Sequence, residues 1–368
     1  MKARAIAIYL PQYYPIPEND SVWGKGYTEW ICTAKAKPLF RGHYQPRIPA
    51  DLGFYDLRVP EVREAQAELA KAAGIEGFMY WHYWFGKGRR LLERPFDEVL
   101  STGQPDFPFC LGWANHSWTT STWKALGHFR PQNNMIVEQT YPGDEDIVAH
   151  FNNVLPAFKD RRYITVSGKP LFVIWAPMEI PDFKHFKDMW NDMAVANGLK
   201  GVFFVGMTSC LEEKYSQLFN VGFDAIIPGY MWQAETKLQS KFIKYGLNLI
   251  REKLDDRFVP LAKYDYGKII KLLSSDLDKR EDVFPSVIPQ WDRSPRSGRK
   301  AIIYYGSTPD LFKKHVQNVL DKIRDKPMDK RIMFIRSWNE WGEGNYIEPD
   351  QKYGTGYLDV LRDVLCSE

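Results

Sequence analysis

Two glutamates three residues apart, Glu340 and Glu343, have the types and spacing best suited to chemistry in this chain. They lie in the stretch Trp-Asn-Glu-Trp-Gly-Glu-Gly at residues 338–344, soon after the apolar run Ile332–Ile335. Carboxyl groups in an aromatic, partly dry setting have raised pKa values and can act as acids near neutral pH. Cleavage of a glycosidic bond uses such a pair of carboxyl groups, and indole faces suit sugar rings. The segment therefore predicts a glycan site with Glu340 and Glu343 as its catalytic pair, rather than two ordinary loop acids.

The elements that must position this pair follow one rhythm, in which a short apolar strand is followed by a loop and an amphipathic helix. The predicted strands are Ala5–Leu10, Gly77–Tyr80, Phe107–Trp113, Pro170–Trp175, Val202–Val205, Ala225–Ile227, Ser286–Pro289 and Ile332–Ile335. The predicted helices are Pro60–Ala73, Phe96–Leu100, Asp144–Phe158, Asp182–Asn197, Leu211–Val221, Pro309–Arg324 and Tyr357–Val364. Eight such units favour the α/β class and a (β/α)₈ TIM barrel, as one catalytic domain over residues 1–368. A doubly wound open sheet is the alternative, but no G-x-G-x-x-G follows the first strand and no P-loop is present.

Two long segments interrupt this rhythm. The first strand is followed by a loop of about fifty residues rich in Pro, Gly and aromatics, and a structureless loop of that length is usually functional. Residues 236–283 are the most polar part, where we expect a helical insertion with residues 236–271 mostly helical. The stretch 293–299 holds three arginines among Ser, Pro and Gly, which is typical of a mobile loop over a cleft.

Polar and aromatic side chains follow the strands in seven of the predicted loops. A barrel places its active site at the carboxyl ends of its strands, so we expect these side chains to surround one carbohydrate cleft. The predicted substrate-binding residues from these loops are Tyr9, Gln12, His82, Trp84, Asn115, His116, Tyr230, Trp291, Asp292 and Arg293. Trp84 and its neighbour Trp81 fit a plain core role equally well.

Four stretches of the chain resemble the WbsX family, a glycoside hydrolase family 99-like group often labelled as lipopolysaccharide or O-antigen biosynthesis proteins. They are Tyr-Leu-Pro-Gln-Tyr at 9–13, Gly-Tyr-Thr-Glu-Trp at 26–30, Gly-Ile-Glu-Gly-Phe-Met-Tyr-Trp at 74–81, and the acid segment at 338–344. The resemblance covers nearly the whole chain, and the fold that it implies is again a (β/α)₈ barrel. The related hydrolases are endo-acting α-mannosidases and α-mannanases.

The resemblance also implies roles for particular residues. Glu340 would be the base that takes the proton of the sugar 2-hydroxyl, giving a 1,2-anhydro intermediate in a retaining reaction, and Glu343 would be the general acid. Asn339 matches a sugar-binding asparagine, and Glu29 resembles a substrate-binding acid. Gly342 departs from the hydrolases, which commonly have His or another larger residue there, and this difference bears on sugar specificity.

Composition excludes several other classes of function. A net charge of +3, from 49 basic and 46 acidic residues, gives no support to a nucleic-acid or anionic-membrane partner. Neither a membrane span nor a targeting segment is visible, and the four scattered cysteines fit free thiols, so we expect a cytoplasmic protein. No metal or other cofactor is expected, because His82 and His116 lack a third ligand at useful spacing. The D-x-D sequence at 276–278 fits a solvated helix face better than a nucleotide-sugar site.

Three functions stay open from the sequence. The first is a retaining endo-type glycoside hydrolase of α-mannosidase or α-mannanase type, and the second is a glycosyltransferase of lipopolysaccharide, O-antigen or capsule synthesis. The third is a non-catalytic glycan-binding barrel. The acid pair and the absence of a nucleotide-diphosphate site favour the hydrolase. The expected partner is an oligo- or polysaccharide, including a lipid-linked one, and the sequence does not indicate an oligomeric state.

Overall fold

The computed structural model of the protein describes residues 2–120, 134–209, 212–239, 246 and 259–366. Within these ranges, eight parallel strands form one curved sheet in the order β10-β9-β8-β4-β2-β1-β15-β12. Their bounds are β1 (Arg4–Tyr9), β2 (Gly77–Trp84), β4 (Phe109–Trp113), β8 (Lys169–Ile174), β9 (Phe203–Ser209), β10 (Ala225–Gly229), β12 (Ser286–Val287) and β15 (Ile332–Ile335). A parallel bridge between Ile226 of β10 and Val283, just before β12, brings the two ends of the sheet together. The predicted (β/α)₈ barrel is confirmed.

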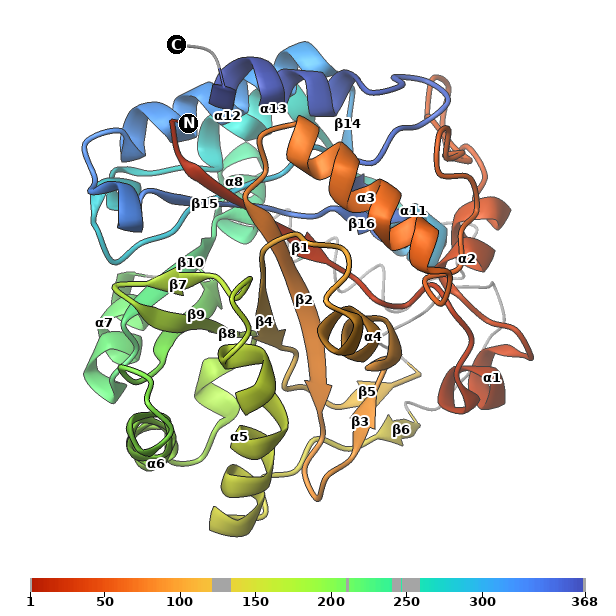
Figure 1. Ribbon diagram of the computed structural model, residues 1–368. Helices are drawn as coiled ribbons and strands as arrows, with labels where there is room; N and C mark the ends of the chain where they lie inside the picture. The colour runs from red at the N-terminus through yellow and green to blue at the C-terminus, as the bar shows by residue number, and fades with distance from the viewer. Residues whose placement is uncertain (1, 121–133, 210–211, 240–245, 247–258, 367–368) are drawn as a thin grey trace.

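Helices cover the outside of this sheet (Figure 1). They are α3 (Pro60–Ala72), α4 (Arg94–Thr102), α5 (Asp144–Phe158), α6 (Phe183–Ala196), α7 (Glu212–Val221), α8 (Met231–Leu238), α12 (Pro309–Ile323) and α13 (Gly356–Cys366). Helix α12 begins with a sequence typical of a helix N-terminus. The Thr308 hydroxyl caps it by accepting from the backbone N–H of Leu311, and Pro309 occupies its first turn. Because helices cover one face of the sheet and the barrel interior covers the other, the strands are apolar throughout, and Ile6, Phe172 and Phe334 are fully buried.

The first long loop is not structureless, which corrects the prediction. It contains two short helices, α1 (Pro17–Trp23) and α2 (Glu29–Lys35). Both are seven residues long, too short for the apolar repeat that reveals a helix in a sequence. A contact with a later part of the same loop anchors helix α2: the indole N–H of Trp30 donates to the backbone oxygen of Tyr55 at 2.7 Å. The loop therefore presents Glu29 from a fixed helical turn.

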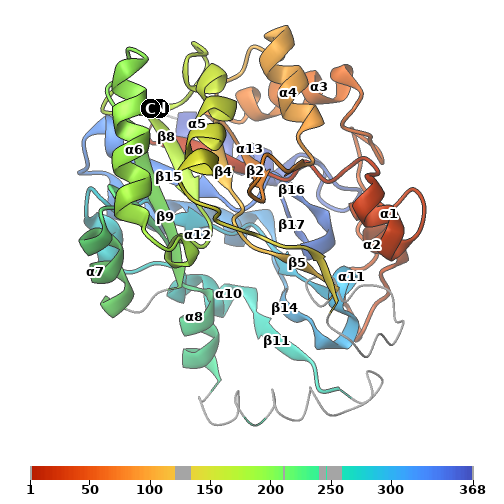
Figure 2. The same cartoon turned by 90° about the horizontal axis from the view of Figure 1, so that it is seen from below.

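The predicted helical insertion is also corrected in part. Residues 240–245 and 247–258 of it lie outside the described residues. The rest includes the strand β11 (Ala262–Asp265) and the short helix α10 (Tyr266–Ile269). Strand β11 pairs with β14 (Ile302–Tyr305), which pairs with β13 (Trp291–Asp292) in a small separate sheet. Figure 2 shows α8, α10, β11 and β14 together on one side of the barrel, away from α3 and α4.

Candidate active site

The acid segment forms a small hairpin beyond the last strand of the barrel. Strands β16 (Asn339–Glu340) and β17 (Asn345–Tyr346) pair antiparallel, and a single turn of 3₁₀ helix over Trp341–Glu343 connects them. Gly344 ends this turn with a φ of +56°, a left-handed conformation that favours glycine. A Cβ at Gly344 would also lie 2.8 Å from the Cβ of Asp292. The hairpin thus holds both glutamates on a tight turn at the carboxyl end of β15.

Asn339 ties this hairpin to the end of β1. Its side-chain oxygen accepts from the backbone N–H of Leu10 at 2.8 Å, and its side-chain amide donates to the Leu10 oxygen at 3.0 Å. The side chain is completely buried, and it also contacts the Tyr55 hydroxyl. Both ends of the amide are engaged, so Asn339 positions the acid turn, and its contact with sugar stays a prediction.

The two indoles of the segment are fully buried, and they too position the turn. The ring of Trp341 stacks on Tyr346 with centroids 3.7 Å apart, and its N–H donates to the carboxyl group of Glu348 at 2.6 Å. Glu348 accepts further hydrogen bonds from Tyr55 and Gln66. The predicted sugar-stacking surface therefore has to come from other aromatic residues.

The environments of the two glutamates push their pKa values apart. Glu340 is half-buried, and its closest polar contact is the indole N–H of Trp81 at 3.4 Å. Burial, reinforced by the nearby charge of Glu343, raises the pKa of Glu340 to about 7. Burial opposes ionisation of Glu343 as well, but attraction to Arg293, Arg296 and the more distant Arg336 lowers the pKa of Glu343. Of the two carboxyl groups, Glu340 therefore binds a proton more readily and Glu343 favours the ionised form.

Arginines account for this difference. Arg296, in the short helix α11 (Ser294–Ser297), donates to Glu343 at 2.6 Å, and the half-exposed Arg293 lies 3.2 Å from the same oxygen. The stretch expected to be a mobile loop contains the helical turn α11, in which Arg296 is only 6% exposed. Arg293 does lie beside the acid pair, as its position in the sequence suggested.

Arg296 also pairs with Glu29, which stands at the first turn of α2 and is completely buried. The guanidinium lies 2.8 Å from the Glu29 carboxylate. Burial raises the pKa of Glu29 against the opposing attraction of Arg296. A Cβ at Gly342 would lie 2.1 Å from this carboxylate, so only glycine leaves room for the ion pair. Glu29 is therefore at the acid turn as expected, but its partner there is Arg296.

Aromatic side chains lie beside Glu340 at the mouth of the barrel. Trp81 of β2 meets the edge of Trp175, which follows β8 and is 36% exposed, at 5.6 Å between centroids. His116 lies 6.3 Å from Trp175, and burial lowers the pKa of its imidazole. Trp291 is buried and lies under Arg336. Trp291 and His116 thus reach the site region, together with Trp175 and Trp81.

Tyr9, His82 and Trp84, predicted to bind substrate, point toward the outer helices. The Tyr9 hydroxyl donates to Gln66 of α3 at 2.6 Å, and the indole N–H of Trp84 donates to Asp146 of α5 at 3.1 Å. His82 shares a hydrogen bond of 2.9 Å with His150 of α5. The cause is the alternation of side chains along a strand. Because β2 continues to Trp84, its odd-numbered residues Trp81 and Tyr83 face the acid pair, and its even-numbered residues face the helices.

The side chains of Asn115 and Tyr230 hold loops in place through hydrogen bonds. The Asn115 amide exchanges hydrogen bonds of 2.8 Å with the backbone of Ala176, which fixes the segment that carries Trp175. Tyr230 donates to the buried Asp278 at 2.6 Å. That Asn115 and Tyr230 contact substrate stays a prediction. Gln12 is completely buried, and its amide atoms have no hydrogen-bond partner in the part of the chain that the structure describes.

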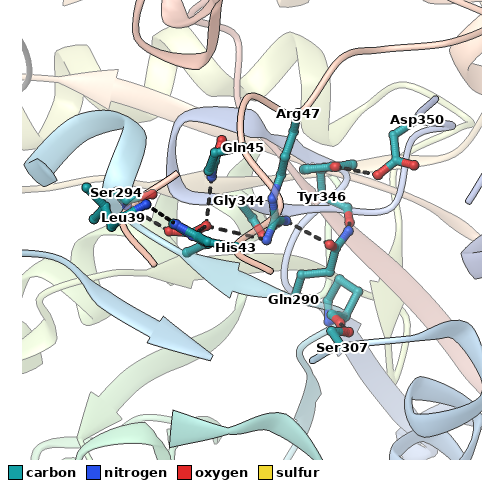
Figure 3. Close-up of polar contacts among 12 residues, drawn as sticks. Leu39, His43, Gln45, Arg47, Gln290, Ser294, Ser307, Gly344, Tyr346 and Asp350 are labelled. Atoms are coloured by element: carbon teal, nitrogen blue, oxygen red, sulfur yellow. Dashed lines mark hydrogen bonds and ion pairs between the residues drawn. The ribbon is translucent and has the colours of Figure 1, made fainter. Parts of the chain in front are cut away.

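Asp292, predicted to bind substrate, is the centre of a buried polar network. It accepts from His43 at 2.8 Å, from Gln45 at 2.7 Å and from the backbone of Ser294 at 2.9 Å. Although burial disfavours its charge, these partners and the nearby Arg47 lower the pKa of Asp292 to about 2. Figure 3 shows His43, Gln45 and Arg47 of the first long loop gathered beside Gln290 and Gly344. The network therefore locks this loop against the acid hairpin.

No group of three or more His, Cys, Asp or Glu side chains lies together in a metal-binding arrangement within the described ranges. The two aspartates of the D-x-D sequence have different partners. Asp278 belongs to the capping box of a 3₁₀ turn and accepts from Tyr230. The exposed Asp276 pairs with Lys279 and Lys322. No helix of the described chain combines the length and the apolar character that crossing a bilayer requires.

The model of the family described as glycosyltransferase WbsX matches residues 5–361. Two proteins named uncharacterized protein WxcX, from two strains of Xanthomonas campestris pv. campestris, are 32% identical over 366 and 373 residues. Each match covers 99% of this chain and 50% of the relative, so the chain spans about half the length of these relatives.

Solved structures share the fold. A "glycoside hydrolase-like protein" aligns over 98% of this chain and 93% of its own, with a TM-score of 0.57 and 15% identity. The GH99 endo-alpha-mannosidase from Bacteroides thetaiotaomicron aligns over 99% of this chain and 96% of its own, again with a TM-score of 0.57 and 15% identity. At this identity the likeness establishes the barrel alone.

Proposed function

The chain belongs to the glycosyltransferase WbsX family, and from that premise we propose that it is a glycan-active enzyme that cleaves a glycosidic bond with Glu340 and Glu343. One observation carries the proposal. Two carboxyl groups with oppositely shifted pKa values are held on a rigid turn at the carboxyl end of the barrel strands, where barrel enzymes carry their active sites. Paired titratable groups with separated pKa values identify an acid and a base.

The proton positions suggest how the pair divides the work. Glu340, with a pKa of about 7, donates a proton to the glycosidic oxygen as the bond from that oxygen to C1 breaks. Glu343, kept ionised by Arg293 and Arg296, accepts the proton of the attacking hydroxyl. In the retaining route implied by the resemblance, that hydroxyl belongs to C2 of the same sugar, and water later opens the anhydro ring.

This assignment reverses the roles expected from the resemblance, in which Glu340 is the base and Glu343 the acid. The reversal rests on contacts of this chain, since an acid bound to an arginine at 2.6 Å is a poor proton donor. Glu340 has no arginine within ion-pair distance in the described structure, and its pKa of about 7 suits a group that gives up a proton near neutral pH.

Hydrolysis is preferred to glycosyl transfer, which is the activity in the family's description and the second candidate. A nucleotide-sugar donor needs a phosphate-binding turn or a metal-binding D-x-D pair. Here Asp276 is paired with lysines and Asp278 with Tyr230. A purely glycan-binding barrel would not need two acids with separated pKa values. We propose an oligo- or polysaccharide as substrate, and α-mannan is the first probe because solved neighbours are endo-α-mannosidases.

The test uses Glu340→Gln and Glu343→Gln, with Glu61→Gln on the exposed start of α3 as the matched control. Reducing ends released from α-mannan and from bacterial surface polysaccharides are measured, together with hydrolysis of 2,4-dinitrophenyl glycosides. Each active-site variant should lose about 10²–10⁴-fold in rate on the polysaccharide, because each lacks one proton-transfer group. The control should match the wild type.

A good aryl leaving group needs little protonation, so it should partly rescue Glu340→Gln and leave Glu343→Gln inactive. Rescue of Glu343→Gln alone would restore the roles implied by the resemblance. Wild-type rates in both variants would refute the site, and sugar transfer from a nucleotide donor without hydrolysis would favour the transferase.

A further inference from the structure

Arg336 occupies the mouth of the barrel from the strand that leads to the acid hairpin. It follows β15 directly, and its backbone N–H donates to Val287 of β12 at 2.9 Å. Its guanidinium lies over the indole of Trp291 at 5.1 Å and over that of Trp175 at 5.5 Å. Trp175 follows β8, which is four places from β15 in the eight-strand order. Arg336 therefore reaches across the barrel mouth to the opposite wall.

Arg336 differs in its partners from the other two arginines beside the acid pair. Arg293 and Arg296 each contact the Glu343 carboxylate within 3.2 Å. Arg336 is half-buried, and within the described residues it has no ion pair and no hydrogen bond from its guanidinium. A guanidinium has five N–H donors in one plane, and aromatic contacts through its face do not use them. Its donors are therefore available to a ligand in the barrel mouth.

The charge of the surrounding groups favours an anionic ligand in the barrel mouth. Three arginines, at 293, 296 and 336, face the three carboxyl groups of Glu29, Glu340 and Glu343. Burial raises the pKa of Glu340 to about 7, so protonation of that one group leaves the cluster with a net positive charge. A partly dry cation between aromatic walls attracts an anion more strongly than a solvated one does.

We propose that Arg336, between Trp175 and Trp291, binds the carboxylate of an acidic sugar, so that the substrate is a uronate-containing glycan. This inference rests on the proposed function and adds the class of sugar to it. A single unpaired guanidinium matches one carboxylate, which it can hold through two parallel hydrogen bonds. A diphosphate carries more charge and would call for further unpaired cations or a backbone phosphate loop. The indoles of Trp175 and Trp291 offer stacking surfaces for the sugar ring that carries the carboxylate.

Matched sugar pairs test this inference on the full chain. The probes are methyl glucuronide, methyl galacturonide and methyl mannuronide, each compared with its neutral methyl hexoside, in tryptophan-fluorescence titrations. At least one uronide should bind about 10–100-fold more tightly than its neutral partner, the range expected for a charge-assisted hydrogen bond. This ratio should fall to about one in Arg336→Gln, be intermediate in Arg336→Lys, and persist in Arg362→Gln, whose arginine is on the surface of α13.

A measurement on the wild type keeps the test independent of variant folding. Raising the salt from about 0.05 M to about 0.5 M should weaken uronide binding and leave hexoside binding unchanged. Equal binding of uronides and hexosides would overturn the inference while leaving the proposed function standing. Tighter binding of glucose 1-phosphate than of every uronide would replace the carboxylate by a phosphate and also overturn it. Binding of no sugar, together with no hydrolysis of any polysaccharide, would refute the proposed function itself.

Discussion

Arg296 is the side chain on which the charge state of the acid pair depends, and its replacement by methionine gives the sharpest test. Glu29 is fully buried and Arg296 is 6% exposed, and their charges approach to 2.8 Å. Removing one partner of a buried ion pair costs about 3–5 kcal/mol, because the remaining charge is left without compensation. We therefore expect Arg296→Met to lower the free energy of unfolding by about that amount.

The partner substitution should cost less. Glu29→Gln leaves Arg296 paired with Glu343 at 2.6 Å, so a loss of about 1–3 kcal/mol is expected. In the double variant no buried charge is left alone, so the losses should not add. A double-mutant cycle measured by urea unfolding should give a coupling of about 2–3 kcal/mol, at the upper end of the range for residues in contact.

A surface pair of the same chain provides the control. Lys184 and Asp188 lie four residues apart on α6, with 79% and 58% of their side chains exposed. Such a pair should couple by no more than about 0.5 kcal/mol. If the coupling between Glu29 and Arg296 is as small as that control value, the reasoning from burial is refuted.

The same substitution should change the pH profile of activity. Removing the charge of Arg296 removes one of the attractions that keep the pKa of Glu343 low. Arg293 remains beside Glu343 at 3.2 Å, so we expect the acidic limb of the rate profile to move to higher pH in Arg296→Met without losing the effect of Arg293. An unshifted limb would show that Arg296 does not hold Glu343 ionised.

Three further outcomes are expected. Although burial opposes ionisation of Asp292, the hydrogen bond from His43 and the charge of Arg47 lower its pKa from 3.8 to about 2, so it contributes roughly 2 kcal/mol above pH 3.8, lost as the pH falls toward 2. Acid unfolding of Asp292→Asn should lack this component, and an unchanged acid transition would contradict it. Gly342→Ala places a Cβ 2.1 Å from Glu29, so calorimetry should show a lower melting temperature and an activity assay a reduced rate, whereas wild-type values for both would disprove the close approach. Because no three-ligand metal cluster occurs among the described residues, activity should survive a chelator, and calorimetry should detect no nucleotide-sugar binding; micromolar affinity for a nucleotide sugar would support transfer.

The barrel was predictable because its strands are buried on both faces. Runs such as Ile332–Ile335 are apolar throughout, and the structure places a strand at each predicted position. Helix α5 has the predicted bounds, since acidic residues mark its first turn. The helices of the first long loop and the small sheet of β11, β13 and β14 were not predicted. These elements are short, and contacts with distant parts of the chain hold them, so local sequence carries little sign of them.

The site was predictable only where a residue follows a strand end. Trp291, Arg293 and the acid pair satisfy that rule, and the structure brings them together. His82 and Trp84 fail it because β2 continues to Trp84, and side-chain alternation then turns both residues outward. Arg336 follows β15 directly and so satisfies the same rule, although it is not among the predicted site residues. Arg296 could not be placed, since nothing local distinguishes a buried arginine from a mobile one.

Gly342 links the departure from the hydrolases to the charge of the site. The hydrolases that the motifs resemble commonly have a larger residue at this position. Here the absence of a side chain lets Glu29 approach the acid turn, and Arg296 then spans Glu29 and Glu343. The position of Arg296 therefore also depends on the glycine, because a Cβ at Gly342 would lie 2.9 Å from the Arg296 guanidinium. This arrangement accompanies a lowered pKa for Glu343 and a raised pKa for Glu340, which supports the proposed exchange of acid and base roles.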